Sequence, residues 1–175
     1  MSLVLTGANP GVLLRADGAV TAFASVWQVE WSERGSGRAL VLWHDGRVRL
    51  LGPDPGLSEW LAEEFVRHFG EVGGLPWEPA PPERADVEMD LDLGHGLTAK
   101  AADVTVEIEH VLDRRPFTQA GLRMGAAEYT LSNVYAPCRT ARITVAGTAV
   151  PGAPEVDGES STAFLATAET WIRTG

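Results

Sequence analysis

The chain has 175 residues, of which 45% are hydrophobic and 22% are charged, a balance typical of a folded globular protein and not of a disordered one. Its formal net charge of −10 argues against nucleic acid or an anionic membrane as a partner, because an acidic surface repels phosphate groups. The single cysteine, Cys138, excludes an internal disulfide and every metal site built from several thiolates.

The start of the chain lacks the basic region and apolar run of a secretory signal. No segment reaches the roughly 18 consecutive apolar residues that a transmembrane helix requires. We therefore expect a cytoplasmic protein with no membrane association.

The first predicted strand covers residues 18–31. Side chains on a strand point alternately to its two faces, so residues two apart share a face. One face then carries mostly small and aliphatic residues, whereas the other carries an aromatic-rich set: Phe23, Ser25, Trp27, Val29 and Trp31.

The next element is a hairpin around Asp45-Gly46. Asp-Gly between two alternating strands is typical of a type I′ turn, in which both central residues need a positive φ. A two-residue loop also sets the register of the two strands. It pairs His44 with Arg47, Trp43 with Val48, and Val41 with Leu50.

A helix follows the break at residues 52–56. Asp54 and Pro55 have the residue types of an N-cap and a first helical position, and Gly70 predicts the end. Apolar residues recur every three or four positions between them, which predicts a helix with one buried face. These residues are Leu57, Trp60, Leu61, Phe65 and His68.

Residues 71–83 are rich in glycine and proline, which predicts a stiff crossing loop. We expect one domain over residues 1–175. It comprises N-terminal strands and the helix at 1–70, this crossover at 71–83, and C-terminal antiparallel strands at 84–173.

The C-terminal part returns to strand periodicity. Alternation predicts a strand over 87–93, a turn at 94–96 and a long return strand to His110, with a bulge at 101–103. Further strands are predicted at 129–135, 141–150 and 163–172. The chain therefore predicts a mainly β protein: an antiparallel β-barrel or a curled β-sheet or sandwich, with one packed α-helix.

The tryptophans suggest a ligand pocket. Trp27, Trp31 and Trp43 come from neighbouring strands, and on an inner face they would form the aromatic wall typical of small-molecule sites. The alternative is that they only fill the core, with each indole N–H hydrogen-bonded. Asn133, on the same face of its strand as Tyr129, would add a polar anchor if that face points inward.

A catalytic role is a second possibility. His110 continues the apolar face of Val104, Val106 and Ile108, so an inward imidazole could act as a general acid or base. Tyr129 would then be the electrophilic partner. The competing interpretation of His110 is a buried, hydrogen-bonded histidine at a strand end.

Recognisable catalytic motifs are absent from the chain: no phosphate-binding loop, dinucleotide fingerprint, nucleophile elbow or zinc-protease helix occurs. We expect no metal and no cofactor. An acidic row is predicted as a solvated outer face, with binding of a basic partner as the alternative. The row comprises Glu88, Asp90, Asp92, Glu107 and Glu109.

These observations lead to three functional hypotheses. The first is a β-barrel that binds a small apolar or aromatic ligand in an aromatic-lined pocket. The second is a cofactor-independent lyase, isomerase or cyclase that uses the same pocket, and the third is an acidic protein-interaction module. A homodimer is compatible with all three, because exposed sheet edges can pair with each other.

Overall fold

The computed structural model describes residues 1–78 and 80–174. Helical structure is confined to one stretch, with α1 at Pro55–Glu64 followed by the 3₁₀ turns Val66–His68 and Gly70–Val72. The strands are β1 (Ser2–Ala8), β2 (Gly11–Ala16), β3 (Ala19–Ser32), β4 (Gly37–His44), β5 (Arg47–Gly52), β6 (Glu83–Arg84), β7 (Val87–Asp92), β8 (Gly96–Ala101), β9 (Val104–Val111), β10 (Arg115–Met124), β11 (Ala127–Val145), β12 (Thr148–Ala149), β13 (Val156–Asp157), β14 (Ser160–Ser161) and β15 (Ala163–Ile172).

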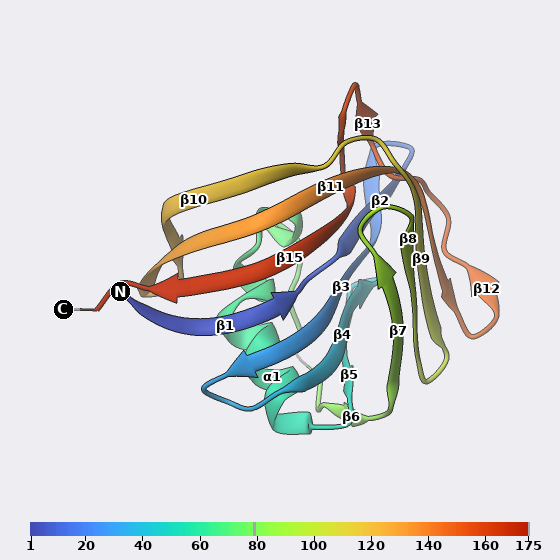
Figure 1. Ribbon diagram of the computed structural model, residues 1–175. Coiled ribbons are helices and arrows are strands. Elements are labelled where there is room, and N and C mark those ends of the chain that lie inside the picture. Colours follow the sequence, from blue (N-terminus) through green and yellow to red (C-terminus); the bar gives the residue numbers. More distant parts are fainter. Residues whose placement is uncertain (79, 175) are drawn as a thin grey trace.

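Most strands belong to one sheet with the order β6-β5-β4-β3-β1-β15-β11-β9-β8-β7. β2 continues the position of β1 between β3 and β15, and β10 extends the sheet beyond β11. The sheet curls into a small closed antiparallel barrel with extra strands, as the sequence predicts (Figure 1). At the closure, Arg38 Nη1 donates a hydrogen bond of 3.3 Å to the carbonyl of Val87 on β7.

The barrel interior is filled by small and aliphatic side chains. Residues 22, 24 and 26 of β3 face this interior, together with the apolar residues of β7, β8 and β9. Val104, Val106 and Ile108 are fully buried there. Because these side chains pack against one another, the interior is a hydrophobic core.

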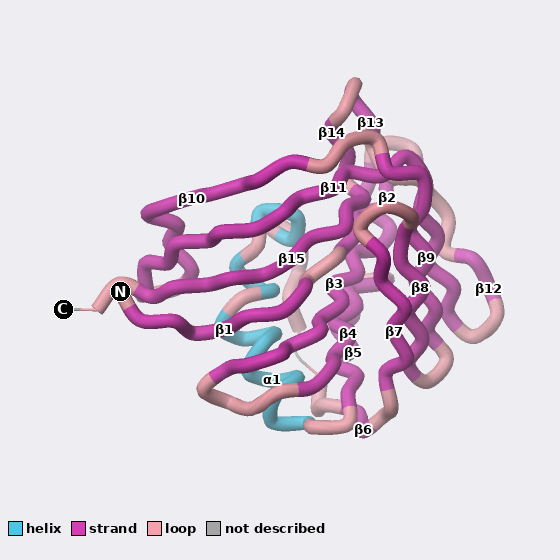
Figure 2. Tube along the Cα trace, viewed as in Figure 1, coloured by secondary structure: helices cyan, strands magenta, loops and turns pink. Residues whose placement is uncertain are grey.

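A second core lies on the other face of the sheet, under α1. It contains Phe23, Trp27 and Trp43 from the strands, together with Leu57 and Leu61 from the helix. Figure 2 shows the helical stretch along one side of the sheet. The aromatic face of β3 therefore packs outside the barrel, so the expectation that its tryptophans face a barrel interior is wrong.

The Asp45-Gly46 hairpin is confirmed in type and register. Both turn residues have positive φ, +53° and +73°, and His44 pairs with Arg47, as predicted. The bulge expected at 101–103 is wrong, because β8 and β9 join there through a tight turn. Ala102 accommodates this turn with a φ of +49°.

Strand β11 spans two segments that the sequence separates at Pro137. Up to Tyr135, one neighbour of β11 is β10. From Cys138 onward, the neighbour is β9 instead. A proline has no N–H to donate to a sheet ladder, and the change of neighbour occurs where that N–H is missing. The Pro137 carbonyl still accepts a hydrogen bond of 2.8 Å from Leu112 N.

Helix α1 begins as predicted and ends earlier than predicted. The Asp54 carboxylate accepts hydrogen bonds from the N–H groups of Gly56 at 3.0 Å and Leu57 at 3.2 Å, which is the action of an N-cap. The regular helix ends at Glu64, and the two 3₁₀ turns carry the chain to Val72. No helix in the described part of the chain is long and apolar enough to cross a membrane.

Candidate functional site: an aromatic cleft beside the helix

A cleft of about 560 Å³ opens on the face of the sheet that α1 covers only in part. Its floor comes from β10, β11 and β15, and its wall from Trp27 and residues 65–71. The regular helix ends at Glu64, and the 3₁₀ turns that follow it border the cleft. The volume lies within the range typical of small-molecule sites.

The strand register orders the residues of the floor. Arg115 pairs with Tyr135, Phe117 with Asn133, and Gln119 with Leu131, so these side chains share one face. Polar groups concentrate at the Arg115 end, where the β14 residues Ser160 and Ser161 join the lining. The opposite end is apolar: Phe65, Leu122 and Met124.

The wall is a cluster of aromatic rings. Trp27 stacks on Phe69 with ring centroids 6.3 Å apart, and lies 6.0 Å from Phe65. Trp27 is only 3% exposed, and its buried Nε1–H has no hydrogen-bond partner among the described residues. Buried donors are normally paired, so this indole N–H is an exception within the second core.

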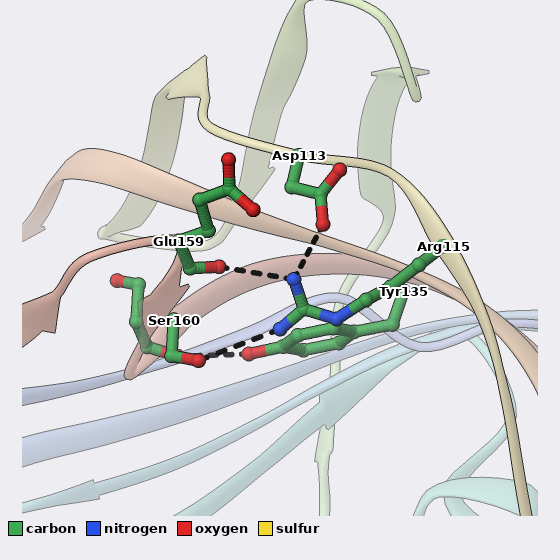
Figure 3. A network of polar contacts seen from close by, with 6 residues as sticks. Asp113, Arg115, Tyr135, Glu159 and Ser160 are labelled. Carbon is green, nitrogen blue, oxygen red and sulfur yellow. Dashed lines mark hydrogen bonds and ion pairs between the residues drawn. The ribbon is translucent and has the colours of Figure 1, made fainter.

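The polar end is organised around Arg115 (Figure 3). Its Nη1 donates to the Asp113 carboxylate at 2.6 Å and to the backbone carbonyl of Glu159 at 3.2 Å. Its guanidinium carbon lies 5.3 Å from the centroid of the Tyr135 ring, a cation–π distance. The Tyr135 hydroxyl donates to the Ser161 carbonyl at 3.0 Å, so β10, β11 and β14 are tied together here.

The ionisation of this network follows from its contacts. The hydrogen bond from Arg115 holds the pKa of the Asp113 carboxyl below its ordinary value. Burial raises the pKa of the Tyr135 phenol. At neutral pH the polar end therefore contains a charged arginine–aspartate pair and a neutral tyrosine.

The backbone ladder between β11 and β15 is interrupted in the middle of the floor. Regular pairing stops between Leu131 and Tyr135. Side chains bridge the gap: Asn133 Oδ1 accepts from Glu169 N at 3.1 Å, and Thr167 Oγ1 accepts from Val134 N at 2.8 Å. The side-chain carbonyl of Asn133 thus takes part in a hydrogen bond within the sheet, whereas the N–H groups of its side-chain amide remain available to the cleft.

Two of the six residues singled out from the sequence line this cleft, namely Trp27 and Asn133. Trp43 lies in the second core, where its Nε1 donates to the Pro76 carbonyl at 2.8 Å. Trp31 is 49% exposed, because a bulge between β1 and β3 follows Val29 and shifts the register. The three tryptophans therefore do not share one wall.

His110 and Tyr129 do not come together. His110 has a φ of +63°, a left-handed conformation that breaks the strand alternation, so it is exposed like Glu109 before it. The predicted inward orientation of His110 is therefore wrong. Tyr129 is 4% exposed and lies edge-on against Phe65, with ring centroids 5.5 Å apart.

Sequence reasoning missed the whole contribution of β10. Alternation places Arg115, Phe117 and Gln119 on one face, but an irregularity between Gln119 and Leu122 interrupts the pattern. Positive φ at Gly121, +68°, marks this irregularity. An alternating stretch beside a glycine was the available signal.

The acidic row lies on the outer face of the barrel, as predicted, and four of its five residues are exposed. Asp90, Asp92, Glu109 and His110 border a shallow depression near the β7–β8 turn. The described residues contain no group of three or more histidine, cysteine or acidic side chains that could hold a metal ion. Cys138 is fully buried, and burial raises its pKa to about 11.

Comparison with known proteins found no match to the chain among family models, curated proteins or solved structures.

Proposed function

We propose that this protein binds a small, largely apolar or aromatic molecule in the cleft between β10, β11, β15 and the helical stretch. The observation that carries the proposal is the wall formed by Trp27, Phe65 and Phe69 over a cleft of about 560 Å³. Small-molecule sites are typically concave and apolar with a few fixed polar groups.

The polar groups of the cleft support the same function. The Asn133 amide N–H groups and the Gln119 side chain have no hydrogen-bond partner among the described residues, and both residues line the cleft. Arg115 and Tyr135 are held in place by the network at one end. Such fixed polar groups orient a bound molecule, whereas the aromatic wall supplies most of the apolar contact.

The test uses N-phenyl-1-naphthylamine, an uncharged probe whose fluorescence rises in apolar surroundings. We expect saturable binding of one probe per chain, with energy transfer from tryptophan that decreases in Trp27→Phe. Failure of the probe to bind at a defined stoichiometry would contradict the proposal.

A matched pair of variants locates the bound probe. Gln119 lines the cleft and is exposed, so Gln119→Trp narrows the cleft without entering the core. Thr118 is its neighbour, is also exposed, and lies outside the cleft lining. We expect Gln119→Trp to weaken binding about tenfold and Thr118→Trp to leave it unchanged. Equal affinities in the two variants would place the probe elsewhere.

A further inference from the structure

The charges at the polar end of the cleft are already balanced. Arg115 is the one lysine or arginine among the described lining residues. Its guanidinium is 2.6 Å from the Asp113 carboxylate, and the two side chains are 37% and 33% exposed. A cation that is already paired offers an incoming anion less net attraction than a free one, because the carboxylate beside it repels the anion.

The surroundings of this pair add negative charge. Glu71 also lines the cleft, and the whole chain has a formal net charge of −10. An anionic head placed here would lose its water and gain no unpaired cation in return, which is costly. A cationic head would also lose its hydration here, and the guanidinium of Arg115 would repel it.

Uncharged donors and acceptors, in contrast, find partners from this end to the middle of the floor. Gln119 and the free amide N–H groups of Asn133 line the floor, and the Ser160 hydroxyl stands at the rim, 3.4 Å from Arg115 Nη2. The apolar end with Phe65, Leu122 and Met124 lies at the other end of the same strands. The cleft is therefore amphipathic along its length.

From this arrangement we infer that the cleft selects an elongated amphipathic molecule whose head is uncharged, such as a hydroxyl- or amide-bearing group on an apolar tail. Asp113 is the residue that sets this selectivity, because it neutralises Arg115. The inference rests on the proposed binding function and specifies the chemical class of the ligand.

The experiment compares three probes with the same dodecyl-length tail: monododecanoylglycerol, dodecanoate and dodecyltrimethylammonium. The affinity of each probe is measured by its displacement of bound N-phenyl-1-naphthylamine, at concentrations below the one at which the probe aggregates. We expect the uncharged glyceride to bind about tenfold more tightly than either ion. Equal or tighter binding of dodecanoate or dodecyltrimethylammonium would overturn the inference, while probe binding itself would still support the proposed function.

Two charge variants test the role assigned to Asp113. Asp113→Asn removes the negative charge that pairs with Arg115. We therefore expect dodecanoate to bind several-fold more tightly, and the difference between its affinity and that of the glyceride to become smaller. Glu159→Gln is the matched control, because it removes one negative charge from an exposed residue that contacts Arg115 only through its backbone carbonyl. The same change in both variants would overturn the role of Asp113.

Gln119→Leu tests whether the side chain of Gln119 recognises the uncharged head of the ligand. This variant removes an uncharged hydrogen-bonding group and leaves an apolar side chain that is shorter by one atom. We expect it to weaken binding of the glyceride several-fold more than binding of N-phenyl-1-naphthylamine, which has no hydroxyl-bearing head. An unchanged affinity for the glyceride would overturn a head position near Asn133 and Gln119.

Discussion

Trp43 donates a hydrogen bond from its indole Nε1 to the backbone carbonyl of Pro76 at 2.8 Å. This contact ties the glycine- and proline-rich crossover at 71–83 to β4, across 33 positions of sequence. Leu75 and Trp77 pack against the same core. Residues 75–77 of the crossover are therefore held against the sheet.

Loss of this contact should destabilise the fold. Trp43→Phe keeps an aromatic ring in the second core but removes the N–H donor and part of the buried volume. We expect the free energy of unfolding to fall by about 2 kcal/mol in urea titrations. Trp31→Phe, at a 49% exposed position, should change it by less than about 0.5 kcal/mol. Equal effects would contradict the role given to the Pro76 contact.

The N-cap of α1 gives a second prediction. Asp54→Ala removes the acceptor for the N–H groups of Gly56 and Leu57, and should cost about 0.5–2 kcal/mol of unfolding free energy. Asp54→Asn keeps an oxygen that can accept both bonds and should remain close to the parent protein. Thermal unfolding of the three proteins at one pH checks this order, and a loss in Asp54→Asn as large as that in Asp54→Ala would contradict it.

Much of the local structure is predictable from the sequence because it depends on neighbours along the chain. The Asp45-Gly46 turn and the Asp54 cap are examples, since their conformations follow from the turn and capping preferences of those residues. Residues that share a face of β3 are equally predictable. Which face lies inside the barrel depends on how the sheet curls, and alternation carries no information on that.

The candidate site was only partly predictable for the same reason. Trp27 and Asn133 line the cleft, but they come from strands separated by over 100 residues, and the rest of the wall depends on where α1 ends. His110 was misplaced because one positive φ, +63°, reverses the alternation at the end of β9. Arg115 gained its partner in Tyr135 only through the β10–β11 pairing.

The buried thiol predicts a specific alkaline effect on stability. Burial raises the pKa of Cys138 from 9.0 to about 11, so the folded state keeps the thiol protonated over a range in which the unfolded state ionises. The stabilisation is therefore complete below pH 9 and is lost as the pH rises from 9 towards 11.

Cys138→Ala isolates this effect, because both proteins share the alkaline titration of Tyr129 and Tyr135. The unfolding free energy of the parent protein, measured relative to that of Cys138→Ala, should decrease across this range. The measurement is a series of urea titrations at increasing pH. A difference that stays constant with pH would show that the thiol ionises equally in both states.

The close approach of β1 and β3 gives the last prediction. Gly7 has a φ of +151°, and a Cβ at this position would collide with the backbone carbonyl of Gln28. Because the obstacle is backbone in a β-bulge, relief requires the two strands to separate. Gly7→Ala should therefore lower the unfolding free energy by about 3 kcal/mol or more.

Gly70→Ala is the matched control, since a Cβ there meets nothing within 4 Å and φ is not positive. It should change the unfolding free energy by no more than about 0.5 kcal/mol. Urea titration of both variants measures the contrast, and a Gly7→Ala protein as stable as Gly70→Ala would refute the packing described for β1 and β3.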